Sequence, residues 1–420
     1  MKSYFMQPLR GTKDILPHEI IYWQQIYTKA SDILTIHNYS EIRTPIIEST
    51  NLFERTIGES TDIINKEMYS FIDQSNRNIT LRPEATASIA RAFISNKLYE
   101  NKLQKLWYLG PMFRYERPQS GRQRQFHQLG IECIGSLSPM ADTEVIQLAN
   151  KILNQLKLKD YILEINSIGN LQEREIYKID LVEYLLQYQK DLDVDSQNRL
   201  YSNPLRILDS KNRKTQEILS NAPNLNNYLS KTSNEHFYLV CKYLDNLNIS
   251  YKINHKLVRG LDYYNHTTFE IKTDSPNSQN TICGGGRYDN LIEQLGGPKT
   301  PAVGWAIGIE RLLKIIRQEL KLSQQKITVY VATQGLAAQA KIWEIVQNLE
   351  KEKINFELDL SNTSFQKQIK RASKLGAKFC IILGDQEINN NCITTRNLDE
   401  HKQYTICYSQ FLKEIKKFKS

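Results

Sequence analysis

The stretch that most constrains the fold spans residues 107–135, where two apolar segments flank an arginine-rich loop. Residues 106–113 (LWYLGPMF) and 126–134 (FHQLGIECI) have the length and composition of buried strands. The loop between them contains Pro118 and Gly121, which favour turns. This spacing predicts an antiparallel hairpin with a long basic loop.

Two polar residues of the second segment point to a pocket. Side chains alternate along a strand, so Gln128 and Glu132 share one face with Phe126 and Gly130. A carboxylate and an amide on an otherwise apolar face are typical of a binding pocket. The alternative is a surface hairpin with solvated charges. The flanking segments are too apolar for a fully exposed ribbon, which favours the pocket.

The sequence FRYE, a basic loop and then RQFHQLGIE resembles motif 2 of the class II aminoacyl-tRNA synthetases, in the form found in histidyl-tRNA synthetases. The resemblance implies that Arg114 holds the α-phosphate of ATP and that Glu116 and Arg122 also contact ATP. It implies that the loop meets the acceptor end of tRNA. The alternative is a solvated loop that becomes ordered when ATP binds. The loop residues assigned to the acceptor end are Arg117, Gln119 and Arg124.

Bulk properties narrow the class of protein. A chain of 420 residues predicts about two to three domains. The content of 40% hydrophobic and 24% charged residues is ordinary for a globular protein, and the net charge of +9 fits a polyanionic partner without identifying one. Six scattered cysteines, none at metal-finger spacing, predict reduced thiols and no structural zinc site. We expect no membrane partner, and a location in a bacterial cytoplasm or a plastid stroma.

The N-terminal region predicts a helix followed by an extended segment. Residues 17–36 carry apolar side chains at helical spacing, and residues 39–49 (YSEIRTPIIES) read as extended. Pro45 cannot donate to a strand ladder, so this segment should lie at an edge or an interface. The pair resembles class II motif 1, which implies a symmetric homodimer. An ordinary helix–strand unit fits the local pattern equally well.

A strand pair over residues 67–71 and 78–83 should lead into a helix that starts near residue 84. Glu84 and Thr86 lie at this strand-to-helix corner. Acidic residues also favour the first turn of a helix for reasons unrelated to binding. In register with the family, both residues bind the ammonium group of histidine. Ala85 stands where the family usually has glycine, and its methyl group should be tolerated, although it could narrow the pocket.

Two further blocks carry the resemblance. LVRGLDYYNHTTFEI (residues 257–271) contains Arg259, Tyr263 and Tyr264. CGGGRYDNLIEQLGG (residues 283–297) reads as a glycine-rich turn that lacks the ending of a P-loop, and its glycines at 284–286 should allow close approach to the backbone. Together they resemble the two signature blocks of histidyl-tRNA synthetases. This implies a second α-phosphate contact from Arg259. The tyrosines implied at the histidine pocket are Tyr263, Tyr264 and Tyr288, although one of the first two should only pack in the core.

The rest of the chain completes the family pattern. AVGWAIGIERLLKII (residues 302–316) predicts a strand running into a helix and resembles motif 3, whose arginine, here Arg311, holds the γ-phosphate. From residue 326, alternating strands and helices predict parallel strands covered by helices and resemble the anticodon-binding domain. We expect an α+β catalytic domain, residues 1–325, with an antiparallel sheet flanked by helices and a helical insertion at about 171–247. An α/β anticodon-binding domain, residues 326–420, should follow.

These residues suit the activation of an amino acid. The carboxylate of histidine and the α-phosphate of ATP are both anions, so the transition state needs fixed positive charge. By resemblance, Arg114, Arg259 and Gln128 are catalytic, and Mg²⁺ with unassigned ligands bridges the phosphates. Neutral imidazole has one donor and one acceptor. Glu132 would accept from it and Tyr264 would donate to it.

The expected function is that of a histidine–tRNA ligase, with ATP, histidine and tRNA(His) as substrates. Two alternatives remain: a histidine-binding regulatory relative and a general RNA-binding protein. The retained Arg114, Arg259 and Arg311 argue against the first, and the pocket residues argue against the second. His127 lies one residue off the Gln128 face, so we expect it to be packed and hydrogen-bonded on the opposite side.

Overall fold

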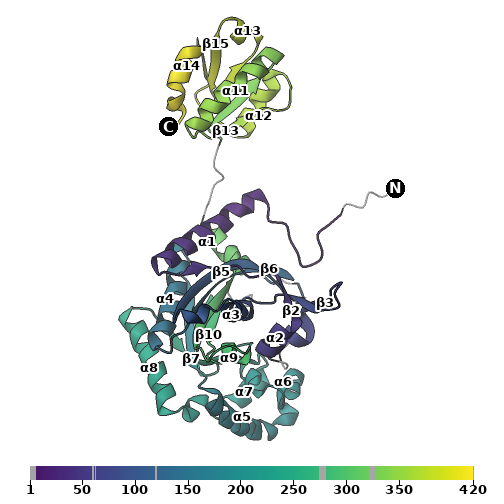
Figure 1. Ribbon diagram of the computed structural model, residues 1–420, viewed down its shortest axis with the longest axis vertical. Helices are drawn as coiled ribbons and strands as arrows, with labels where there is room; N and C mark the ends of the chain where they lie inside the picture. The colour runs from purple at the N-terminus through teal and green to yellow at the C-terminus, as the bar shows by residue number, and fades with distance from the viewer. Residues whose placement is uncertain are drawn as a thin grey trace, which may run out of the picture. The chain divides into compact units, whose positions relative to one another are not determined.

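The structure is a computed structural model that describes residues 6–58, 61, 63–118, 121–273, 281–320 and 327–419. The chain forms two compact units, Met1–Leu322 and Ser323–Ser420 (Figure 1). Most of the candidate linker, residues 318–326, lies outside the described residues. Within the described ranges, none of the helices combines the length and apolar character that a membrane span requires.

An eight-stranded sheet organises the N-terminal unit. Its central six strands are antiparallel, and the outermost strand at each end pairs in parallel. The antiparallel sheet predicted from the sequence is confirmed. In order across the sheet the strands are β1 (Ser40–Glu41), β5 (Gln104–Phe113), β6 (Gln125–Ile134), β11 (Ala302–Gly308), β10 (Thr281–Arg287), β9 (Asn265–Thr273), β7 (Tyr161–Ser167) and β8 (Lys252–Ile253).

The predicted hairpin lies inside this sheet. Strands β5 and β6 pair antiparallel, with Gly110 opposite Gln128 and Leu106 opposite Glu132. The glycine-rich segment, in contrast, is no turn: Gly284, Gly285 and Gly286 lie within β10, between β9 and β11. Glycine is depleted in strands and resembles a turn signal, yet here it lets neighbouring groups approach the backbone closely.

The N-terminal helix and the extended segment form as the pattern predicts. Helix α1 spans Pro17–Ile36. The extended segment divides into β1 and β2 (Ile47–Ser49), and each lies at the edge of a sheet. Helix α2 (Thr50–Ile57) follows β2 in the chain. Strands β3 (Tyr69–Ile72) and β4 (Asn78–Leu81) come next and form a three-stranded sheet with β2, in the order β2-β4-β3. Helix α3 (Thr86–Ser95) follows β4 and leads to the site.

Each face of the large sheet has its own hydrophobic core. One core joins α1, α4 (Pro139–Gln155), α8 (Lys231–Asn246) and α10 (Ile309–Glu319) to alternate residues of β6 such as Leu129 and Ile131. The opposite face packs against α3, α9 (Leu291–Gln294) and the insertion helices. Because side chains alternate along β6, Gln128 and Glu132 lie on this second face.

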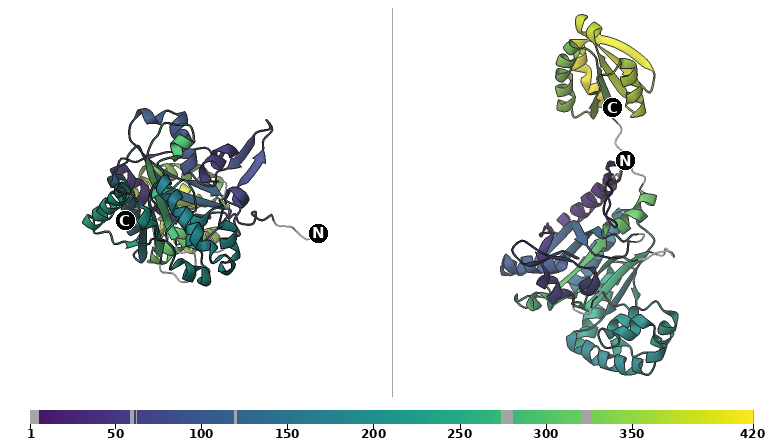
Figure 2. Two further views of the ribbon diagram at one scale, coloured as in Figure 1. Left: turned by 90° about the horizontal axis from the view of Figure 1, so that it is seen from below. Right: turned by 90° about the vertical axis from the view of Figure 1, so that its right-hand side faces the viewer.

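The region 171–247 is helical, as expected, and most of its helices gather at one end of the N-terminal unit (Figure 2). A capping box starts the first helix, in which Asn170 accepts from the N–H of Glu173 and Glu173 accepts from the N–H of Asn170. Pro204 begins a 3₁₀ turn. Within this region, three α-helices precede α8: α5 (Leu171–Leu186), α6 (Val194–Arg199) and α7 (Arg213–Leu219).

The C-terminal unit contains a five-stranded sheet in the order β13-β12-β14-β15-β16. The first three strands are parallel, as predicted, whereas β15 and β16 are antiparallel because a short connection joins them as a hairpin. The pattern also missed the short helix α13. The elements are β12 (Val329–Thr333), α11 (Leu336–Lys351), β13 (Phe356–Leu358), α12 (Phe365–Lys374), β14 (Phe379–Leu383), α13 (Asp385–Asn389), β15 (Cys392–Asn397), β16 (Lys402–Cys407) and α14 (Tyr408–Glu414).

Candidate active site

A cavity of about 570 Å³ opens in the N-terminal unit beside β6, β10 and β11. The structure brings together here the residues that the sequence assigns to histidine and ATP. Their individual roles stay predictions. The histidine group in the lining is Glu84, Thr86, Gln128, Glu132, Tyr263, Tyr264 and Tyr288, and the ATP group is Arg114, Glu116, Arg122, Arg259 and Arg311.

Glu132 is the most enclosed acid of the cavity, with a relative exposure of 1%. The Thr86 hydroxyl donates to its Oε1 over 2.8 Å, and the Tyr288 hydroxyl donates to its Oε2. Burial raises the pKa of Glu132 to about 8, although both hydroxyl donors act to lower it. The side chain is therefore held in one position before any substrate arrives.

Gly304 makes room for this acid. It lies opposite Glu132 in the β6–β11 ladder. A Cβ atom at Gly304 would overlap the Glu132 carboxylate and the carbonyl oxygen of Ile131. Gly308 in the same motif is different, because a Cβ there would meet nothing within 4 Å. The glycine at 304 is thus required by close approach.

Glu84 both caps a helix and lines the cavity. Its two carboxylate oxygens accept from the backbone N–H groups of Thr86 and Ala87, each over 2.7 Å, at the start of α3. Complete burial raises the pKa of Glu84, although these N–H groups and Arg114 act in the opposite direction. Glu84 thus has the helix-start role and also faces the cavity, while its binding role stays a prediction.

Three tyrosines form the wall around Glu132. The ring centroids of Tyr263 and Tyr264 are 4.7 Å apart, and those of Tyr263 and Tyr288 are 5.7 Å apart. Burial raises the pKa of all three phenols, so they are neutral hydrogen-bond donors near neutral pH. Tyr263 and Tyr264 both line the cavity, and both also pack in the core. Their positions therefore do not show which of the two has only a packing role.

Sequence reasoning missed Tyr108 on β5. It lies opposite Gly130, and a Cβ at Gly130 would overlap its phenol ring. Its hydroxyl is buried without a hydrogen-bond partner among the described residues, as is Oε1 of Gln128. Tyr108 is not one of the lining residues, so it packs behind the site, where Glu132 acts on it electrostatically. Gln128 does line the cavity, and its buried oxygen is suited to a ligand.

The arginines at the other end of the cavity are held by acids and carbonyl groups. Arg259 forms an ion pair with Glu270, a lining residue that the sequence did not single out. Although burial opposes its charged form, the Glu270 carboxylate leaves the pKa of Arg259 above its ordinary value. Gly284 gives this guanidinium space, because a Cβ there would overlap it. Nε of Arg259 is buried and has no hydrogen-bond partner in the described part of the chain.

The other arginines lie nearby. Nε of Arg114 donates to the carbonyl oxygen of Pro83 over 2.9 Å. Arg311 donates to the carbonyl oxygen of Thr281. Burial lowers the pKa of Arg311, and the positive charge of the nearby Arg122 lowers it further. Arg122 pairs with Glu116 over 2.9 Å. Positive charge is thus concentrated at this end of the cavity.

Arg117 and Arg124, two of the loop residues assigned to tRNA, are not among the residues that line the cavity. Arg117 is exposed, and the guanidinium of Arg124 stacks 3.6 Å from the ring centroid of Tyr115. Gln119 lies outside the described residues. His127 is packed and hydrogen-bonded, as predicted, with Nδ1 2.9 Å from Oε1 of Glu310 and an edge contact to Trp23.

The whole fold is similar to a solved synthetase. The crystal structure of apo Staphylococcus aureus histidyl-tRNA synthetase superimposes with a TM-score of 0.81 at 37% identity, covering 98% of this chain and 100% of that one. The antiparallel sheet and the cavity in it therefore define a class II aminoacyl-tRNA synthetase. Residues 11–312 match the family model for histidyl-tRNA synthetase, and residues 327–418 match an anticodon-binding domain.

Sequence relatives agree over the full length. The chloroplastic histidine–tRNA ligase of Gracilaria tenuistipitata var. liui is 78% identical over 99% of both chains. The histidine–tRNA ligase of Cyanothece sp. (strain PCC 7425) is 51% identical over 97% of this chain and 95% of its own. The chain belongs to the histidyl-tRNA synthetase family, and it is an enzyme that ligates histidine to tRNA. Both alternatives raised by the sequence, the regulatory relative and the general RNA-binding protein, are wrong.

Proposed function

We propose that the cavity binds histidine at its Glu132 end and ATP at its arginine end. The carboxylate of histidine attacks the α-phosphate of ATP, which gives histidyl-adenylate and pyrophosphate. The histidyl group then passes to the 3′ end of tRNA(His). One observation carries this assignment: all twelve residues predicted for the two substrates line the same cavity.

Histidine selection rests on Glu132 and Tyr264. The Glu132 carboxylate accepts from one imidazole nitrogen, and the Tyr264 hydroxyl donates to the other. Thr86 and Tyr288 fix the position of Glu132. A side chain that left these buried groups unpaired would be rejected strongly. The groups for the ammonium and carboxylate of the amino acid are Glu84, Thr86 and Gln128, with Tyr263 against them.

Arg114 and Arg259 face the α-phosphate, and Arg311 faces the γ-phosphate, assisted by Arg122. Arginine presents a fork that matches phosphate oxygens and keeps its charge. The guanidinium of Arg259 already pairs with an internal anion, the carboxylate of Glu270. Phosphate oxygens would replace such contacts without moving the arginine far, so positive charge is in place when the transition state forms.

Mg²⁺ would fit at the arginine end of the cavity, where it would enter bound to the phosphates of ATP. Among the described residues, no three potential metal-ligating side chains come together. Magnesium needs only one or two carboxylates when substrate phosphates supply further oxygens. Glu116 and Glu270 line the cavity, and both act electrostatically on Arg311. These two acids would hold the ion, which would neutralise phosphate charge during the reaction.

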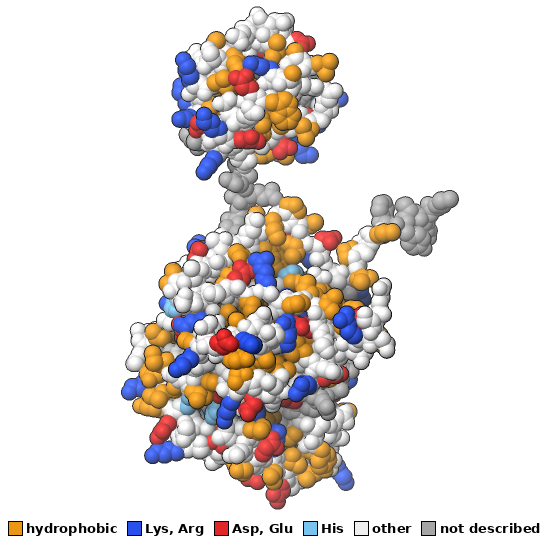
Figure 3. Space-filling model, viewed as in Figure 1, with side chains coloured by type: hydrophobic (Ala, Val, Ile, Leu, Met, Phe, Trp, Pro, Cys, Tyr) orange, Lys and Arg blue, Asp and Glu red, His pale blue; other side chains and the backbone are white. Residues whose placement is uncertain are grey.

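The tRNA has two predicted contacts. Arg117, Gln119 and Arg124 would meet its acceptor end, and the domain of residues 326–420 would bind its anticodon, whereas residues 1–325 carry catalysis. Figure 3 shows basic side chains along one edge of the C-terminal unit, which suits a polyanion. Removing both predicted acceptor-end arginines should lower tRNA charging and leave amino-acid activation unchanged.

The assembly and location follow the family and its relatives. We place the symmetric dimer interface on α1 and β1, because β1 is an edge strand and Ile36 at the end of α1 is 83% exposed. We place the enzyme in a plastid stroma, since three relatives at 54–78% identity are chloroplastic. Sedimentation equilibrium tests the dimer, and immunodetection in isolated plastids tests the location.

The first experiment is ATP–pyrophosphate exchange with each amino acid in turn, without tRNA. Exchange with histidine alone would support the assigned substrates and the pocket. Histidine binding in calorimetry without exchange would reject the roles of the three arginines. Exchange with several amino acids would reject Glu132 and Tyr264 as the selective groups.

A further inference from the structure

Two cysteines of the C-terminal unit face each other across a strand ladder. Cys392 begins β15 and Cys407 ends β16, and the two are direct partners in the antiparallel register. The N–H of Tyr408 donates to the carbonyl oxygen of Asn391 over 3.0 Å. This bond joins the residues just outside the pair, so Cys392 and Cys407 occupy a non-hydrogen-bonded position.

That position suits a disulfide. In non-hydrogen-bonded pairs the Cα atoms lie about 4.5 Å apart, inside the range of roughly 4.4–6.8 Å that disulfides span. The next pair on the same face shows that side chains meet here, because the hydroxyls of Thr394 and Thr405 are 3.0 Å apart. We propose that Cys392 and Cys407 form a reversible intramolecular disulfide across β15 and β16, making this hairpin a thiol-modification site.

The two thiols differ in accessibility and in ionisation. Cys407 is exposed, whereas Cys392 is partly buried. Cys407 Sγ lies 3.4 Å from the Ser409 hydroxyl, and this hydrogen bond together with nearby backbone N–H groups lowers the pKa of Cys407. Burial and the nearby Glu387 raise the pKa of Cys392. Cys407 is therefore the attacking thiol and Cys392 the resolving thiol.

The chemistry requires an external disulfide as the oxidant. The Cys407 thiolate attacks one sulfur of that disulfide, forms a mixed disulfide and expels the first thiolate. Cys392 then attacks the Cys407 sulfur, its proton passes to solvent, and the second external thiolate leaves. In total, two protein thiols become one disulfide while one external disulfide becomes two thiols.

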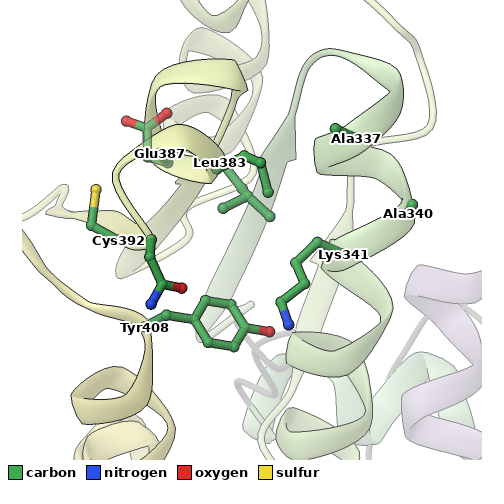
Figure 4. Close-up of a pocket in the computed structure, with 9 residues that line it drawn as sticks. Ala337, Ala340, Lys341, Leu383, Glu387, Cys392 and Tyr408 are labelled. Carbon is green, nitrogen blue, oxygen red and sulfur yellow. The ribbon is translucent and has the colours of Figure 1, made fainter.

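The remaining cysteines make the site selective. Cys133, Cys283 and Cys380 are buried and Cys241 is partly buried, and burial raises the pKa of all four thiols. Cys392 also lines a cavity of about 380 Å³ that Lys341 and Tyr408 line as well (Figure 4). The new bond would therefore change one wall of this cavity as well as join the two strands.

The test uses oxidised glutathione on the full chain, followed by acid quenching, alkylation and peptide mass mapping. The wild type should lose two thiols per chain, retain no glutathione, yield a Cys392–Cys407 peptide, and recover both thiols with dithiothreitol. Glutathione retained on Cys407 beside a free Cys392 would overturn the proposal. So would a Cys407–Cys407 link between two chains, seen as a dimer on a non-reducing gel.

Single serine variants resolve the order of attack. C392S should retain glutathione on Cys407, because the resolving thiol is gone. C407S should leave Cys392 mostly unmodified, since that thiol is less exposed and less ionised. C241S, which alters a partly buried cysteine of α8, is the matched control and should behave like the wild type. Equal modification of Cys392 and Cys407 in the two variants would contradict the assigned roles.

Discussion

The two ends of the active-site cavity are built in different ways. At the proposed histidine end, Glu132 is buried and held by hydroxyl groups of Thr86 and Tyr288, which are neutral donors. At the phosphate end, Arg259 is paired with the carboxylate of Glu270. An incoming anion must compete with that carboxylate. Under the proposed assignment, the first end selects the amino acid and the second exchanges one anion for another.

This difference predicts which changes harm rate and which harm affinity. Groups at the phosphate end act on charge that develops in the transition state, so their loss should appear mainly in kcat. Groups at the histidine end contact the ground state as well, so their loss should appear in binding. A variant at either end that shows the opposite pattern would contradict the comparison.

The largest effect is expected for Arg259→Ala. Loss of one preorganised donor at the reacting phosphate should lower the rate of histidine-dependent pyrophosphate exchange by roughly 10²–10³. Arg213→Ala is the control, because its side chain is 95% exposed in a surface pair with Glu217. Near wild-type exchange in Arg259→Ala would remove Arg259 from the α-phosphate.

Glu132→Gln should act on affinity. The amide keeps the size of the side chain but loses the charge that accepts from imidazole, and a hydrogen bond to a charged group contributes about 1.5–3 kcal/mol. We expect histidine to bind about 10–100-fold more weakly in calorimetry. Glu175→Gln, which removes a charge from an exposed pair with Lys178, should leave binding unchanged. Unchanged affinity in Glu132→Gln would refute the imidazole contact.

Gly304→Ala tests whether space around Glu132 limits the site. The new methyl group would overlap the Glu132 carboxylate and displace it. Overpacking of this kind costs about 1–3 kcal/mol, so we expect histidine-dependent exchange to fall about tenfold at a limiting histidine concentration. Gly308→Ala is matched in strand and chemistry, and its methyl group would meet no protein atom within 4 Å, so it leaves Glu132 in place and reduces only the cavity space that Gly308 lines. Equal loss in both variants would show a general requirement for glycine in β11.

The raised pKa of Glu132 gives the binding a pH dependence. Its pKa of about 8 leaves the acid mostly protonated at pH 7 in the free enzyme, whereas acceptance from an imidazole N–H requires the carboxylate. Affinity for histidine should therefore rise with pH, by about fivefold from pH 7 to pH 8, as the ionised fraction grows. Calorimetry at both pH values checks this, and Glu132→Gln should lack the increase. A wild-type affinity that falls over this interval would reverse the sign and reject the mechanism.

The sequence was informative where the signal is local. Alternation along 126–134 placed Gln128 and Glu132 on one face, and helical spacing defined α1. It was weak where the signal depends on distant partners. The need for glycine at 304 arises only because β11 pairs with β6. The glycine run of β10 was misread as a turn for the same reason, since its strand neighbours are set by the whole sheet.

His127→Ala should give the smallest effect and tests the boundary of the site. Its ring contacts Trp23 and Glu310 and does not line the cavity, so we expect exchange to change less than about threefold while unfolding in urea shows a loss of about 1 kcal/mol. Glu310 does line the cavity and precedes Arg311, however. If His127→Ala lowered kcat tenfold without loss of stability, His127 would be a positioning residue that acts through Glu310. Loss of that effect in a Glu310→Gln background would then assign it to this pair.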